Sequence, residues 1–119
     1  MSDSYQFQRE EKRNSMLIEV LYVPGCPNHQ PVVHRLRNAL RSEAADVPVH
    51  EIPVSDEATA RSLRFPGSPT VRINGQDAEP NGQQSIGLTC RLYSGDSGLP
   101  AEETLQRAIS AAKNREGDI

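Results

Sequence analysis

The fold is decided by residues 17–29, which read LIEVLYVPGCPNH. The first part, Leu17–Val23, is nearly continuous in apolar side chains, which is typical of a strand that lies centrally in a sheet and is covered on both faces. Pro24 and Gly25 end this strand. Apolar residues then recur at the spacing of an amphipathic helix, at Val33, Leu36 and Leu40. Cys26 therefore lies in a turn between a buried strand and a helix.

Cys26 is the most informative residue of the chain. The helix is expected to begin near Asn28, whose side chain can cap it, and Pro31 fits its first turn, where a missing N–H costs nothing. A sulfur at a helix N-terminus lies near free N–H groups, which favours the thiolate that attacks disulfides and binds soft metal ions. His29 is about one turn away and within reach to hydrogen-bond the sulfur. The alternative is an inert cysteine kept for packing.

The whole chain has 119 residues, enough for one domain with a core and too few for two. Residues 1–15 are polar and lack apolar periodicity, so a disordered leader is expected there, followed by one domain over residues 16–119. The net charge is −3, and no basic stripe with interleaved aromatic residues indicates a nucleic-acid partner. The apolar stretches are too short for a bilayer span, and no secretory signal is present, so a cytoplasmic location without a membrane partner is expected.

The other elements are predicted from periodicity and turn residues: a strand over residues 49–54, a short helix from Ser55–Glu57 to Leu63, a strand over 70–74, a strand over 88–93, and a helix that starts at Pro100. Pro48 and Pro53 place the second strand at an edge, and Asn74–Gly75 is a hairpin signal. The predicted fold is α/β, in the order β-α-β-α-β-β-α, with a four-stranded mixed sheet and helices on both faces. The first two strands are expected to be parallel and the last two antiparallel.

This order, together with two loops, resembles the thioredoxin fold. The first loop, Gly25–His29, stands where thioredoxins carry Cys-x-x-Cys, and the second, Gly67–Val71, looks like the thioredoxin segment whose proline is cis and faces the reactive cysteine. The resemblance covers residues 16 to about 112. More narrowly, the Gly-Cys-Pro-x-His motif is similar to that of small bacterial thioredoxin-like proteins, some of which carry alkylmercury-lyase names.

The resemblance implies a cis peptide between Ser68 and Pro69, with the Ser68 backbone presented to an extended substrate or a mixed disulfide. Pro27, Ser68 and Pro69 are accordingly assigned to the substrate-binding surface. Three departures weaken the case for ordinary dithiol turnover. His29 stands where the second cysteine is found, Gly25 replaces the usual aromatic residue before the motif, and Val20 stands where many thioredoxins bury an acid.

The second cysteine, Cys90, alternates with Leu88 and Leu92 and so shares the apolar face of its predicted strand. It is a core cysteine in one interpretation. In the other it is functional, either resolving a mixed disulfide on Cys26 or holding a soft metal ion with Cys26 and His29.

Two arginines, Arg72 and Arg91, fall on outward-alternating positions of neighbouring predicted strands. They are interpreted as a solvated surface, with anion binding as the alternative.

These residues favour thiol-dependent redox or thiol-transfer chemistry with Cys26 as the nucleophile, as in a thiol-disulfide oxidoreductase. The partner is then a protein or small-molecule thiol or disulfide, and no cofactor motif appears. One alternative is a module that binds a thiophilic ion through Cys26 and Cys90, with mercury suggested only by the resemblance. Another is a thioredoxin-like binding domain without chemistry, because a fold does not fix a function.

Overall fold

Strand β1 (Ile18–Tyr22) runs through the middle of the sheet, as its apolar sequence predicts. The computed structural model describes residues 16–80, 86–89, 91–93, 95 and 98–117, and the predicted leader over residues 1–15 lies outside them. Within the described residues, four strands form one sheet in the order β2-β1-β3-β4. The other strands are β2 (Val49–Pro53), β3 (Thr70–Ile73) and β4 (Gln76–Asp77). β1 is parallel to β2 and antiparallel to β3, and β3 is antiparallel to β4, so the α/β class and the mixed sheet are confirmed.

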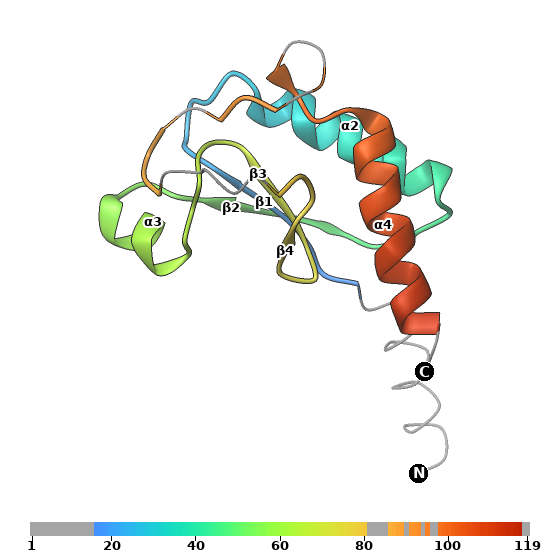
Figure 1. Ribbon diagram of the computed structural model, residues 1–119. Helices are drawn as coiled ribbons and strands as arrows, with labels where there is room; N and C mark the ends of the chain where they lie inside the picture. The colour runs from blue at the N-terminus through green and yellow to red at the C-terminus, as the bar shows by residue number, and fades with distance from the viewer. Residues whose placement is uncertain (1–15, 81–85, 90, 94, 96–97, 118–119) are drawn as a thin grey trace.

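The helices are α2 (His29–Ser42), α3 (Glu57–Ser62) and α4 (Glu102–Gly117). Helices α2 and α4 lie side by side on one face of the sheet, and α3 lies on the other (Figure 1). Successive side chains of a strand point to opposite faces. Ile18 and Val20 of β1 accordingly pack under α2 and α4, whereas Leu21 packs with Ala60 of α3. No helix in the described residues is long and apolar enough to cross a membrane.

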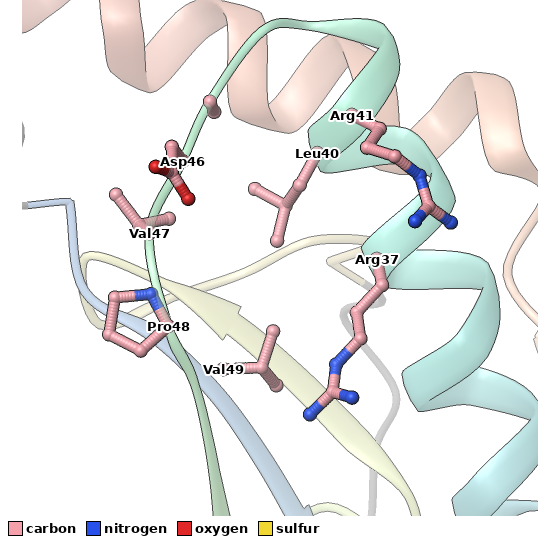
Figure 2. Close-up of a pocket in the computed structure, with 8 residues that line it drawn as sticks. Arg37, Leu40, Arg41, Asp46, Val47, Pro48 and Val49 are labelled. Carbon is pink, nitrogen blue, oxygen red and sulfur yellow. The ribbon is translucent and has the colours of Figure 1, made fainter.

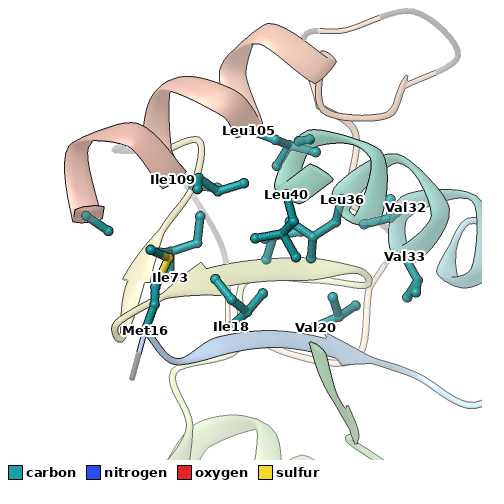
Figure 3. Packing of buried hydrophobic residues seen from close by; sticks show 14 of the residues in the cluster. Met16, Ile18, Val20, Val32, Val33, Leu36, Leu40, Ile73, Leu105 and Ile109 are labelled. Carbon is teal, nitrogen blue, oxygen red and sulfur yellow. The ribbon is translucent and has the colours of Figure 1, made fainter. Parts of the chain in front are cut away.

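The main core lies between β1, β3 and the helix pair α2 and α4. Its residues are Met16, Ile18, Val20, Val32, Val33, Leu36, Ala39, Leu40, Val71, Ile73, Ala78, Leu99, Leu105, Ile109 and Ala112. Figure 3 shows Leu36 of α2 and Ile109 of α4 directed toward the sheet side chains Ile18 and Ile73. The helical spacing of the α2 residues predicts this packing. The core anchors the first turn of α2, and with it the segment that carries Cys26.

One of the two helix starts differs from its prediction in detail. Asn28 occupies the N-cap position of α2, but its side chain makes no capping hydrogen bond. Its backbone has φ −92° and ψ −1°, whereas capping side chains act from an extended backbone. At α3, where the sequence predicts a start within Ser55–Glu57, the cap is Asp56, whose backbone is extended and whose Oδ1 accepts from the Thr59 N–H at 2.7 Å.

The predicted fourth strand is wrong in its position. The described residues between Leu88 and Tyr93 adopt no strand, and β4 is instead Gln76–Asp77, directly after the predicted hairpin turn. Asn74 and Gly75 both take left-handed backbone angles, with φ of 54° and 81°. Such a two-residue turn matches the twist of paired strands and returns the chain at once onto β3. The element order is therefore as predicted, although its fourth strand comes earlier in the sequence.

The burial of residues 91–93 is the reverse of the prediction. Leu92 is 77% exposed, whereas Arg91 is only 7% exposed and Tyr93 is buried. The Arg91 guanidinium binds both oxygens of Asp77, at 2.6 and 2.9 Å, and lies 4.2 Å from the centre of the Tyr93 ring. Burial acts to lower the pKa of Arg91, but the hydrogen bonds and charge of Asp77 outweigh it and hold that pKa above its usual range. Arg91 is thus part of a buried ion pair and not of a solvated surface.

Tyr93 ties this segment to the start of β3. Its hydroxyl donates to the Pro69 carbonyl at 2.8 Å and accepts from the Val71 N–H at 3.2 Å. Burial raises the pKa of the Tyr93 hydroxyl well above its usual range. Because the folded pKa is raised, this tyrosine contributes stability that is fully present below the unfolded value of about 10 and is lost as the pH rises above it.

We therefore expect Tyr93→Phe to reduce the free energy of unfolding by about 1–3 kcal/mol at pH 7, because two buried polar groups lose their partner. The difference between the two proteins should then shrink above pH about 10, by up to about 1.4 kcal/mol per pH unit. Urea denaturation of both proteins from pH 7 to 11 measures this. If the free energies of unfolding of the two proteins differ by the same amount at every pH from 7 to 11, the raised pKa of Tyr93 is contradicted.

Candidate functional site

A tight turn connects β1 to Cys26. The Cys26 N–H donates to the Val23 carbonyl at 3.0 Å, and Gly25 between them has φ +88°. Proline at the second position and glycine with positive φ at the third are the signature of a type II turn. The sequence Val23-Pro24-Gly25-Cys26 therefore fixes where the cysteine leaves the strand.

Cys26 is half-buried and its thiol is free, while Gly25 and Pro27 on either side of it are exposed. Its carbonyl accepts from the His29 N–H at 3.2 Å, so α2 begins directly beyond it. Because Asn28 gives no side-chain cap, the first-turn N–H groups of α2 are not satisfied by that residue. Cys26 thus lies directly before a helix N-terminus that has no side-chain cap.

His29 is held by residues of two strands. Its ring stacks on Tyr22 with centroids 3.6 Å apart, and its Nε2 lies 2.7 Å from Glu51 Oε1. Glu51 in turn lies 3.7 Å from Arg37 Nη2. A neutral imidazole that donates from Nε2 to Glu51 leaves Nδ1 as an acceptor. No hydrogen bond between His29 and the Cys26 sulfur occurs in the described part of the chain.

Glu51 and Tyr22 are the site residues that sequence reasoning missed. They lie on β2 and at the end of β1, and they meet His29 only because the parallel pairing of these strands brings the two segments together. No local spacing signals such a contact, since Glu51 is far from His29 along the chain.

Ser68 connects the Cys26 turn to the rest of the molecule. Its Oγ accepts from the Val23 N–H at 2.9 Å, its N–H donates to the Thr89 carbonyl at 2.7 Å, and its carbonyl accepts from the Arg91 N–H at 2.9 Å. Ser68 is 3% exposed, and Pro69 is buried as well. The cis peptide between Ser68 and Pro69 is present as predicted. The resemblance implies that the Ser68 backbone is open to a substrate. In the structure it is not, because its N–H and its carbonyl are both paired within the chain.

The sequence also predicts Cys90 and a soft metal ion as partners of Cys26. Cys90 lies outside the described residues. Among the residues that the structure does describe, no group of three or more His, Cys, Asp or Glu side chains is arranged to hold a metal ion.

A shallow depression of about 350 Å³ lies between the end of α2 and the segment that leads into β2 (Figure 2). Arg37 and Arg41 stand along one side of it, and Val47, Pro48 and Val49 form the other. Neither Cys26 nor Ser68 lines it. Among its lining residues, Arg37 lies 3.7 Å from Glu51, the residue that contacts His29.

Comparison with known protein families, with curated proteins and with solved structures finds no match for this chain.

Proposed function

We propose that the chain is a thioredoxin-like domain whose function is thiol exchange at Cys26. The order of its elements and the pairing of its strands support the fold assignment: a parallel β1–β2 pair joined through α2, and an antiparallel β3 next to β1. The element order and the parallel first pair are those expected from the sequence. The functional assignment depends on one observation, which is the position of a free, half-buried thiol in an exposed turn at the start of α2.

In the proposed reaction, the Cys26 thiolate attacks one sulfur of a disulfide. A new S–S bond forms between Cys26 and that sulfur, the old S–S bond breaks, and its electron pair leaves on the second sulfur, which takes a proton from water. A second thiol then releases the product. That thiol is Cys90 or an external one, as the sequence predicts. In this proposal Ser68 holds the Cys26 turn through Val23, and His29 receives the Cys26 thiol proton when the attacking thiolate forms.

The site of reaction can be tested directly. Incubation with a small disulfide, followed by proteolysis and mass spectrometry, should find the adduct on Cys26. In the Cys90→Ser protein this adduct should persist. In the natural chain, resolution by Cys90 predicts an internal Cys26–Cys90 disulfide, whereas resolution by an external thiol predicts none. An adduct confined to Cys90 would contradict the proposal.

A separate prediction concerns His29. His29→Ala should slow the exchange at pH 7 by about tenfold, below the range typical of general acid–base groups because no hydrogen bond joins it to the sulfur. His34→Ala is the matched control, since His34 lies exposed on the same helix. We expect the control to retain the natural rate. Equal rates in the two variants would remove His29 from the mechanism. Stopped-flow absorbance with a chromogenic disulfide measures both.

A further inference from the structure

The chain itself fills the position at which an extended polypeptide would pair with the backbone beside Cys26. The covering segment, defined as Thr89 and Arg91–Tyr93, uses both polar groups of the Ser68 backbone: the N–H donates to Thr89 and the carbonyl accepts from Arg91. Extended peptides are recognised by adding such main-chain hydrogen bonds to an open edge. At Ser68 no open edge is available, because the residue is 3% exposed and its backbone is paired.

Ser68 is the residue at which such pairing would matter for the thiol. Its hydroxyl accepts from the Val23 N–H at 2.9 Å, and Val23 is the first residue of the turn that ends at Cys26. A peptide paired with Ser68 would therefore contact the residue that holds the Cys26 turn in place. The covering segment takes this place instead.

The covering segment is fixed by buried contacts. Arg91 forms two hydrogen bonds with Asp77 and a third with the Glu79 carbonyl at 2.6 Å. Tyr93 is tied to Pro69 and Val71 through its hydroxyl. The backbones also approach closely, since a Cβ added at Gly67 would lie 2.9 Å from the Cβ of Arg91. Displacing the segment would break a buried ion pair and both tyrosine hydrogen bonds at once.

A disulfide can still approach the Cys26 thiol at the turn itself. Pro24, Gly25 and Pro27 are exposed, and Cys26 between them is half-buried. The two prolines carry no N–H, so this turn offers a poor backbone for strand pairing. A compact molecule needs no such pairing to bring its sulfur to Cys26.

We propose that Cys26 exchanges with low-molecular-weight disulfides and discriminates against disulfides within extended polypeptide segments. This inference rests on the proposed function, and it names the substrate class of the same site. The reaction is the exchange already described, with the small thiolate as leaving group and no net oxidation or reduction.

The test uses two probes with the same reacting bond. One is the mixed disulfide of N-acetylcysteine methylamide with 2-mercaptoethanol, and the other carries the same disulfide on a cysteine in the middle of a ten-residue unstructured peptide. Both are reacted with the Cys90→Ser protein and, as the reference, with free N-acetylcysteine, and adduct formation is followed by mass spectrometry. The quantity compared is the rate with the small probe divided by the rate with the peptide. We expect this ratio to be on the order of tenfold larger for Cys26 than for the reference thiol, since the blocked surface acts against the peptide.

Equal preference in protein and reference, or a preference for the peptide, would overturn the inference and leave the proposed function in place. If neither probe reacts faster with Cys26 than with the reference thiol, the proposed function is overturned. Tyr93→Phe provides a second measurement, because it loosens the covering segment but keeps the ring under Arg91. In this variant, shown to be folded by circular dichroism, the preference should fall toward the reference value, and an unchanged preference would contradict the role of the segment.

Discussion

Replacing Cys26 by serine is expected to lower the rate of exchange with a small disulfide by about 100-fold or more, because a hydroxyl without an activating base is a very weak nucleophile at neutral pH. The fold should survive the change. Cys26 is half-buried in a turn, and the backbone hydrogen bonds of that turn do not involve its side chain. Stopped-flow absorbance with a chromogenic disulfide measures the rate, and circular dichroism checks the fold.

The matched control for this change is Cys90→Ser, which should keep the first step of exchange at the natural rate. If instead Cys26→Ser retained the rate and Cys90→Ser lost it, the nucleophile would be the other cysteine. If both variants retained it, the exchange would not depend on Cys26, and the assignment of Cys26 as the nucleophile would be contradicted.

The second large effect is expected for Arg91→Met, which keeps the length of the side chain and removes its charge. Breaking a buried ion pair by removing one partner costs about 3–5 kcal/mol, because the other charge is left uncompensated. The side chains of Arg91 and Asp77 are only 6% and 18% exposed, so solvent offers Asp77 little compensation. The free energy of unfolding from urea denaturation should fall by that amount.

Arg72→Met is the natural comparison, because the sequence places both arginines on outward positions of predicted strands. Within the described residues, the Arg72 side chain hydrogen-bonds only to the Arg64 carbonyl, through an exposed bond of 2.9 Å. Its replacement should therefore change the stability by less than about 1 kcal/mol. A similar, small loss in both variants would show that the Asp77–Arg91 pair contributes little to the fold.

Much of this architecture was predictable, because short-range patterns dictate it. The apolar run of β1, the spacing of Val33, Leu36 and Leu40 on α2, and the Asn74–Gly75 turn each indicate a local structure, and the structure contains all three. The position of Cys26 between the strand and the helix follows from the same patterns.

The covering segment was not predictable, because its structure depends on contacts between distant residues. Alternation alone puts Leu92 inside and Arg91 outside. The reverse occurs because Asp77, on a strand of only two residues, supplies a buried countercharge, and Pro69 and Val71 supply partners for the Tyr93 hydroxyl. The Glu51 contact of His29 was missed for the same reason, since it arises from strand pairing.

The most direct test is the rate of alkylation of Cys26 by iodoacetamide at pH 7 in the Cys90→Ser protein, folded and unfolded in denaturant. An ordinary thiol is only a few per cent ionised at this pH, and lower basicity reduces nucleophilicity only partly, so a sulfur held as the thiolate in the native turn should react roughly three- to tenfold faster than in the unfolded chain. A native rate equal to or below the unfolded rate would mean that the fold does not activate Cys26, and thiol exchange would no longer explain this site.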